Sequence, residues 1–104
     1  VGRKTAVIVV DVQSDFTEYK HGSLAVPSSD KRYIKTVQQS TRTLKKDGLT
    51  VFATQDFHPN DHISFYTNHF NAKAFDTISL LDPYRAPLLD EKGQQRTQVL
   101  WPPH

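Results

Sequence analysis

Two short apolar runs, separated by one helical pattern, constrain the fold of this chain more than any other feature. The run 6–10 is continuous and mostly β-branched, as in a strand that is covered on both faces of a parallel sheet. A second strand-like run covers 49–54. Between them, apolar side chains at helical spacing predict a helix over about 30–47, which polar residues at 28–30 can cap and Gly48 can end. This order predicts a βαβ unit and an α/β fold.

An aspartate follows each of the two predicted strands. Asp11 comes directly after the first run, and Asp56 lies just beyond the second. A crossover of this kind makes the strands parallel, so their C-terminal ends emerge at the same edge of the sheet, where open α/β folds bind ligands. We therefore expect Asp11 and Asp56 to share one cleft. For Asp11 alone, a structural role in capping a turn or a helix is an equally good interpretation.

The length of the chain indicates one domain or part of one. The sequence has 104 residues, of which 37% are hydrophobic. Two strands and one long helix are too few to bury a parallel sheet on both faces, which suggests an incomplete domain. From Phe57 onward the periodicity disappears, and only 78–81 and 99–101 resemble strands. A structureless segment of this length is unusual in a compact domain.

Composition argues against several classes of function. The net charge is +2, and the Lys and Arg residues are spread along the chain, so we expect no nucleic-acid partner. The longest apolar run, 6–10, is far too short to cross a bilayer, so we expect a soluble, intracellular protein. The sequence contains no cysteine, which excludes a disulfide framework and a thiolate metal site within these residues.

Asp56 and His58 place a carboxylate and an imidazole on the same side of an extended segment. His62 and His104 are further imidazoles that folding could bring near. Such a ligand set suits zinc, with iron or manganese as alternatives. An isolated Asp-x-His pair is nevertheless more often engaged in surface hydrogen bonds. Pro59 and the missing glutamate exclude the helical His-Glu-x-x-His pattern of zinc proteases.

Four blocks of the sequence stand out in this order: 9–16 (VVDVQSDF), 22–27 (GSLAVP), 54–65 (TQDFHPNDHISF) and 100–104 (LWPPH). Together they resemble the isochorismatase-like hydrolases. Within that superfamily, the Asp-x-His pair and the terminal Trp-Pro-Pro-His resemble the nicotinamidases, also called pyrazinamidases. His21 and the pair 28–29 stand where relatives often have glycine, at turn positions that tolerate the change.

The resemblance implies a three-layer α/β/α fold with a parallel sheet, of which residues 1–104 would form the N-terminal part of a single domain. It also implies roles for individual residues. Asp11 would be the catalytic acid–base residue, and Phe16 and Trp101 would line the pocket for the pyridine ring. The metal would be bound by Asp56, His58 and His104. His62 would be a further ligand or a group that holds metal-bound water.

The activity implied by this resemblance is hydrolysis of nicotinamide, and also of pyrazinamide, in NAD salvage. In that family's mechanism a cysteine thiolate attacks the carboxamide carbon, and the aspartate passes the thiol proton to the departing ammonia. A lysine stabilises the charged pair. A divalent metal, most often zinc, binds the pyridine nitrogen. The cysteine and lysine would lie after His104, so the chain alone would be inactive and the remainder of the enzyme would be its partner.

The resemblance further implies a homo-oligomer in the cytoplasm, with the nucleus or the peroxisome as other compartments. Two other functions stay open from the sequence. The first is a related hydrolase that acts on another small amide. The second is a non-catalytic module that binds zinc for stability alone.

Overall fold

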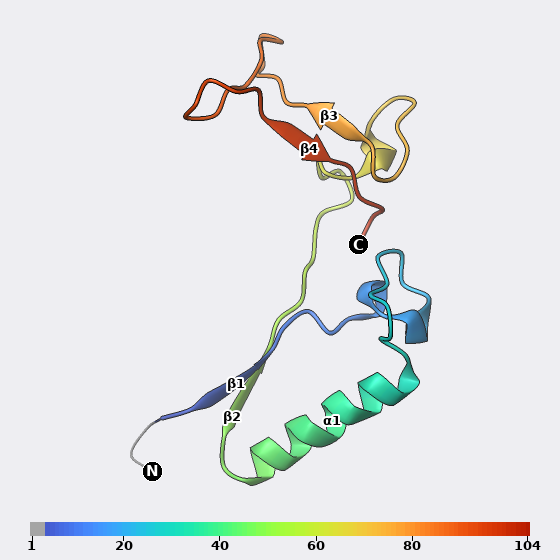
Figure 1. The fold of residues 1–104 in the computed structure, drawn as a ribbon, viewed down its shortest axis with the longest axis vertical. Helices are drawn as coiled ribbons and strands as arrows, with labels where there is room; N and C mark the ends of the chain where they lie inside the picture. Colours follow the sequence, from blue (N-terminus) through green and yellow to red (C-terminus); the bar gives the residue numbers. More distant parts are fainter. Residues whose placement is uncertain (1–3) are drawn as a thin grey trace. The chain divides into compact units, whose positions relative to one another are not determined.

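The computed structural model describes residues 4–104, which divide into two compact units. The first unit contains the chain up to Phe57 together with His104, and the second contains His58–Pro103. Figure 1 shows strands and one long helix in the first unit and a hairpin in the second. Among the helices of residues 4–104, none has the length and apolar character that a membrane crossing requires.

The first unit contains the βαβ arrangement that the sequence predicts. Strand β1 (Ala6–Val9) and strand β2 (Thr50–Ala53) are parallel, and helix α1 (Lys31–Lys46) connects them. The register runs from Ala6 opposite Thr50 to Val9 opposite Ala53. Two short 3-10 helices, η1 (Ser14–Phe16) and η2 (Glu18–Lys20), lie between β1 and α1. The predicted strands and the parallel pairing are confirmed.

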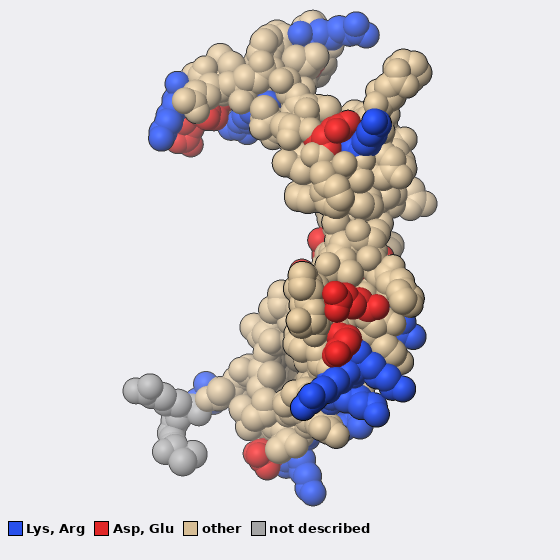
Figure 2. Space-filling model, turned by 45° about the vertical axis from the view of Figure 1, so that its right-hand side comes forward, with Lys and Arg blue, Asp and Glu red and all other residues tan. Residues whose placement is uncertain are grey.

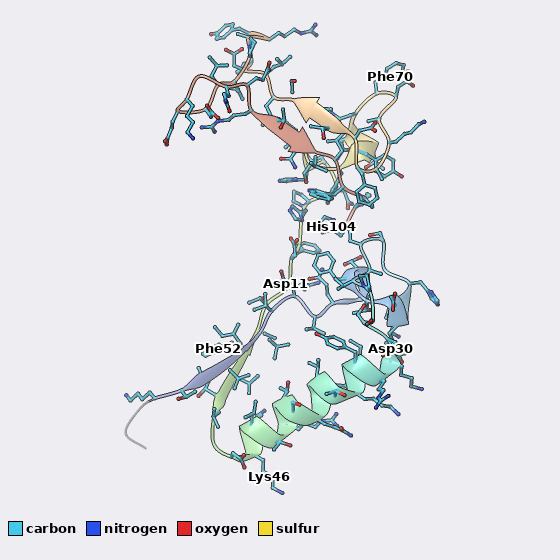
Figure 3. The ribbon with its side chains drawn as sticks, in the orientation of Figure 1. Asp11, Asp30, Lys46, Phe52, Phe70 and His104 are labelled. Atoms are coloured by element: carbon cyan, nitrogen blue, oxygen red, sulfur yellow. The ribbon has the colours of Figure 1, made fainter. Side chains whose placement is uncertain are left out.

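Helix α1 begins and ends as its flanking residues predict. The Asp30 carboxylate accepts a hydrogen bond of 2.9 Å from the main-chain N–H of Tyr33, which satisfies one of the unpaired donors of the first turn. Lys45 and Lys46 occupy the last turn, where positive charge complements the helix dipole. Gly48 follows with a φ of +92°, a conformation that glycine adopts without strain. Figure 3 labels Asp30 and Lys46 at the two ends of the helix.

The two faces of the β1–β2 pair have different surroundings. Val9 and Val51 are half-buried and line, with Ile34 and Val37 of α1, a hollow of about 470 Å³ between helix and sheet. Ile8 and Phe52 point to the opposite face and are 61% and 55% exposed. Within this unit the helix therefore covers one face of the sheet, whereas the run 6–10 indicates a strand that is covered on both.

The second unit is ordered mainly by turns. Strands β3 (Thr77–Ser79) and β4 (Thr97–Val99) pair antiparallel, and η3 (Tyr66–Asn68) precedes them. Between the strands, Asp82 accepts main-chain hydrogen bonds from residues 84 and 86, and Asp90 accepts them from residues 92 and 94. Aspartates close turns in this way with their own side chains. The segment after Phe57 is therefore not structureless, although its strands have only three residues each.

Charged side chains do not form one continuous basic surface on the face drawn in Figure 2. There the Lys and Arg side chains of residues 4–104 occur in several groups, most of them beside Asp or Glu side chains. This distribution agrees with the small net charge of +2.

Candidate active site

Asp11 lies just beyond β1 in a conformation that few residues adopt. Its φ is +52°, in the left-handed region, where aspartate and asparagine are enriched among the residues that carry a side chain. Figure 3 shows Asp11 where the chain leaves the strand. Residues held in this region cost free energy and occur often at functional sites, where neighbouring contacts hold them in place.

Thr54, at the end of the neighbouring strand, makes those contacts. Its hydroxyl donates a hydrogen bond of 2.6 Å to Oδ1 of Asp11 and accepts one of 3.0 Å from the Asp11 N–H. The same N–H lies 3.2 Å from the Thr54 carbonyl oxygen. One side chain therefore holds both the main chain of Asp11 and, through Oδ1, its carboxylate.

Asp56 follows β2 at the edge of the sheet where Asp11 follows β1, as the parallel crossover predicts. Its main chain is bound by the side chain of Gln13, with one hydrogen bond to the Asp56 N–H and one to the Asp56 carbonyl oxygen, each 2.8 Å long. Its carboxylate Oδ2 lies 3.4 Å from Nε2 of His104. These contacts fall within the first unit, so the structure brings Asp11, Asp56 and His104 into one part of the molecule.

The Asp56–His104 separation is informative about what could lie between the two side chains. At 3.4 Å it is longer than a usual N–H···O hydrogen bond. Two ligand atoms that each lie about 2.0–2.1 Å from a tetrahedral zinc ion are about 3.3–3.4 Å apart. An oxygen and a nitrogen donor at this separation therefore fit two corners of such an ion. An ion pair with protonated His104 has similar geometry, and the donor chemistry suits either arrangement.

His58 and His62 both belong to the second unit. Only Phe57 separates His58 from Asp56 along the chain, so connectivity alone keeps the two residues close. The rings of His58 and His62 are 4.6 Å apart between centroids, and the His58 ring also meets the edge of the buried Phe65 at 5.5 Å. The two histidines that the sequence marks as candidate ligands therefore lie in one aromatic cluster with Phe65.

The hydrogen bonds of His62 bear on its role. Its Nδ1 atom accepts the main-chain N–H of Ser64 at 3.2 Å and lies 2.7 Å from the Ser64 hydroxyl oxygen. Because Nδ1 accepts a hydrogen bond, the neutral ring carries its proton on Nε2, an assignment made from the network. A ring in this state donates a hydrogen bond through Nε2. It favours the role of holding a water molecule over that of a direct metal ligand.

The two aromatic residues expected to line a ring pocket lie in different units. Phe16 packs against His104, with ring centroids 5.6 Å apart, and lines with Asp11 a hollow of about 420 Å³ in the first unit. Trp101 belongs to the second unit, where its N–H donates to the Ser64 carbonyl at 2.7 Å and its ring meets Phe75 edge-on at 6.1 Å. Each residue is thus held by its own unit.

Two residues at the site, Gln13 and Thr54, had no role assigned from the sequence. Gln13 lies inside the block 9–16, and Thr54 begins the block 54–65, so both belong to the segments that carry the family resemblance. Their contacts each join residues 43 positions apart, so no local pattern reveals them. Pairing of the parallel strands is the signal that could have placed Thr54 beside Asp11.

The turn between η1 and α1 agrees in part with its expected tolerance. His21 and Ser28 have φ values of +52° and +68°, in the left-handed region that glycine adopts most readily. Both residues are exposed, so their side chains meet no packing constraint there. Ser29 is different, because it is buried and its hydroxyl accepts a hydrogen bond of 2.9 Å from the Glu18 N–H.

Comparisons with known proteins agree on one group of enzymes. No model of a known protein family matches the chain. The chain is 41% identical over 99 residues to the nicotinamidase of Acinetobacter baylyi and 34% identical over 100 residues to that of Saccharomyces cerevisiae. These alignments cover 95% and 94% of the chain but only 37% and 42% of the relatives, so the chain spans about two fifths of their length.

Solved structures give the same result. The yeast nicotinamidase structure matches with a TM-score of 0.67 at 32% identity, covering 95% of this chain and 43% of that one. A nicotinamidase structure from Acinetobacter matches with a TM-score of 0.61 at 37% identity, covering 97% of this chain and 39% of that one. The chain therefore has the α/β fold of part of these structures, and over nearly all its length it is similar to nicotinamidases.

Proposed function

We propose that this chain is the N-terminal part of a nicotinamidase of the isochorismatase-like superfamily, an enzyme that hydrolyses nicotinamide to nicotinate and ammonia in NAD salvage in the cytoplasm. One observation carries the proposal beyond the similarity itself. The acid expected to move protons, Asp11, and two expected metal ligands, Asp56 and His104, lie in one unit, at the end of the parallel strands where open α/β folds bind ligands.

In this proposal Asp11 is the general base and acid. Its Oδ1 atom accepts the Thr54 hydroxyl, which leaves Oδ2 to take a proton from the attacking thiol and to pass it to the departing ammonia. Because the main chain of Asp11 is held by the same threonine, the carboxylate is oriented before substrate binds. The thiol and the lysine of the mechanism would come from the rest of the enzyme, since this chain contains no cysteine.

Asp56, His58 and His104 would hold a divalent metal, with zinc favoured over iron or manganese by the mixed oxygen and nitrogen donor set. The 3.4 Å between Asp56 Oδ2 and His104 Nε2 supports two of these ligands, and the single residue between Asp56 and His58 supports the third. When bound, the ion would supply a Lewis acid that binds the ring nitrogen of the substrate and orients it. His62 would donate from Nε2 to a water in this region.

Phe16 and Trp101 would form apolar walls for the flat ring of the substrate. Phe16 is suited to this role because its ring packs on His104, a proposed metal ligand. An aromatic wall beside the ligand would hold a pyridine ring in the plane that its nitrogen requires. In this proposal residues 1–104 are one part of a single domain, and the complete enzyme is a homo-oligomer.

The replacement of Asp11 by asparagine in the complete protein that contains this chain tests the assignment. Asparagine tolerates the left-handed conformation, so Asp11→Asn should fold. It cannot accept the thiol proton, so ammonia release from nicotinamide and trapping of the acyl-enzyme should both be lost while zinc content is unchanged. Equal loss of zinc and activity would contradict the separation of acid–base and metal-binding roles.

The substrate is tested by comparing ammonia release from nicotinamide, pyrazinamide and benzamide. Benzamide has the same carboxamide but no ring nitrogen, so a metal that orients the ring predicts a much lower kcat/KM for it. Equal rates for nicotinamide and benzamide would assign the chain to a different small-amide hydrolase. Tight zinc binding without ammonia release from any amide would indicate a non-catalytic metal-binding protein.

A further inference from the structure

The parallel ladder of β1 and β2 ends just before Asp56. Its last main-chain bonds join Thr54 N–H to the Val9 carbonyl at 2.9 Å and Asp11 N–H to the Thr54 carbonyl at 3.2 Å. Beyond this point the chain turns away at Asp11, whose φ is +52°. Strand pairing therefore no longer reaches the main chain of Asp56, although this residue must present its carboxylate in a defined direction if it binds a metal.

The side chain of Gln13 takes the place of the missing strand. Its Oε1 atom accepts the Asp56 N–H at 2.8 Å, and its Nε2 atom donates to the Asp56 carbonyl oxygen at 2.8 Å. One planar amide thus satisfies both main-chain groups of one residue, as the facing residue of an antiparallel strand would. A side chain with only donors or only acceptors cannot do this.

Asp15 determines which way the Gln13 amide points. The second N–H of Gln13 Nε2 donates to Oδ2 of Asp15 at 3.2 Å. If the amide were turned over, its oxygen would face both the Asp15 carboxylate and the Asp56 carbonyl oxygen, and no proton would lie between them. The orientation is therefore set by the acceptors around it.

We propose that Gln13 is a positioning residue for the metal centre, which holds the main chain of Asp56 and so directs its carboxylate toward the ion. The inference rests on the proposed metal site and adds to it a residue that touches neither metal nor substrate. Partners of this kind orient the ligands of a metal ion, and their loss weakens metal binding by about 10- to 100-fold. Because the contact here is to the main chain, we expect the lower end of that range.

Three variants of the complete protein test this proposal. Gln13→Met keeps the length of the side chain and removes both hydrogen bonds. Gln13→Glu keeps the shape but replaces the donor with a charge that faces the Asp15 carboxylate and the Asp56 carbonyl. Gln39→Met makes the same chemical change at an exposed position of α1 and is the matched control.

Two quantities are measured for each variant, the Kd for zinc by competition with a chelating dye and the hydrogen-exchange rate of the Asp56 amide. Gln13→Met should weaken zinc binding about tenfold and Gln13→Glu by at least as much. Both should speed exchange at Asp56 relative to wild type and to Gln39→Met, with the thermal midpoint of each protein recorded to show that it is folded.

Wild-type zinc affinity together with wild-type exchange at Asp56 in Gln13→Met would overturn the proposal. Faster exchange at Asp56 with an unchanged zinc Kd would also overturn it, because Asp56 would then need no help to bind the ion. A wild-type protein that binds no zinc would refute the metal centre itself, and this result is distinguished from the others because it appears before any substitution is made.

Discussion

Replacing Thr54 by valine should slow the proposed reaction without affecting metal binding. Valine has nearly the same shape as threonine and suits the end of a strand, so the change removes the hydroxyl and little else. The Asp11 N–H keeps its contact to the carbonyl oxygen of residue 54, whereas the 2.6 Å bond to the Asp11 carboxylate is lost. The carboxylate is then free to turn away from the position in which it accepts a proton.

The size of the effect follows from that bond. A hydrogen bond to a charged group contributes about 1.5–3 kcal/mol. Thr54 is exposed, so water replaces part of the lost interaction and the lower value applies. About 1.4 kcal/mol corresponds to a factor of ten in rate. We therefore expect kcat/KM for nicotinamide to fall about tenfold in Thr54→Val, mainly through kcat, because the contact orients the proposed acid–base group, Asp11.

The assay is ammonia release by the complete protein, with zinc content measured in the same samples. Thr54→Ser restores the hydroxyl and should stay within about threefold of wild type, since the donor to the charged group is retained. A valine variant as active as wild type would refute the reasoning. So would a serine variant as impaired as the valine variant, because shape and not the hydroxyl would then be responsible.

Three further substitutions, each paired with a control substitution, test other parts of the structure. Gly22→Ala should lower the free energy of unfolding by about 3 kcal/mol in denaturant titrations, because the new Cβ would lie 2.1 Å from the main-chain oxygen of Asp15. Gly48→Ala meets no atom within 4 Å and should lower it by about 1 kcal/mol, because of the positive φ alone. Asp30→Ala removes the cap of α1 and should cost about 1 kcal/mol in the same titration, whereas asparagine should restore most of it. His104→Ala should weaken zinc binding by at least about 100-fold, as a proposed direct ligand is lost. His69 is bound to the Ile63 carbonyl, and His69→Ala should leave the zinc Kd unchanged.

The first unit was largely predictable because its sequence signals are local. A continuous β-branched run, a helical repeat and a capping aspartate each act within one element, and α1 spans Lys31–Lys46 where a helix over about 30–47 is predicted. The position of Asp11 and Asp56 at one edge of the sheet followed from connectivity, since a helix between two neighbouring strands makes them parallel.

The second unit was less predictable because its order comes from turns. Strand-like residues were recognised near β3 and β4, but each strand has three residues and gives no useful periodicity. Turns that are closed by Asp82 and Asp90 depend on the rotamer of one side chain. The contact of Gln13 with Asp56 escaped prediction for a related reason, because a side-chain amide that replaces a strand leaves no pattern in either segment.

The left-handed conformation of Asp11 also restricts how this position can vary over time. Glutamate, the other residue with a carboxylate, is disfavoured there by the left-handed main chain as well as by its longer side chain. Glutamate is therefore a poor replacement for aspartate at this position. Glycine and asparagine satisfy the main chain but bring no acid. In a saturation library at this position, asparagine and glycine should therefore cost the least stability, and aspartate should be the single residue that combines a stable main chain with activity.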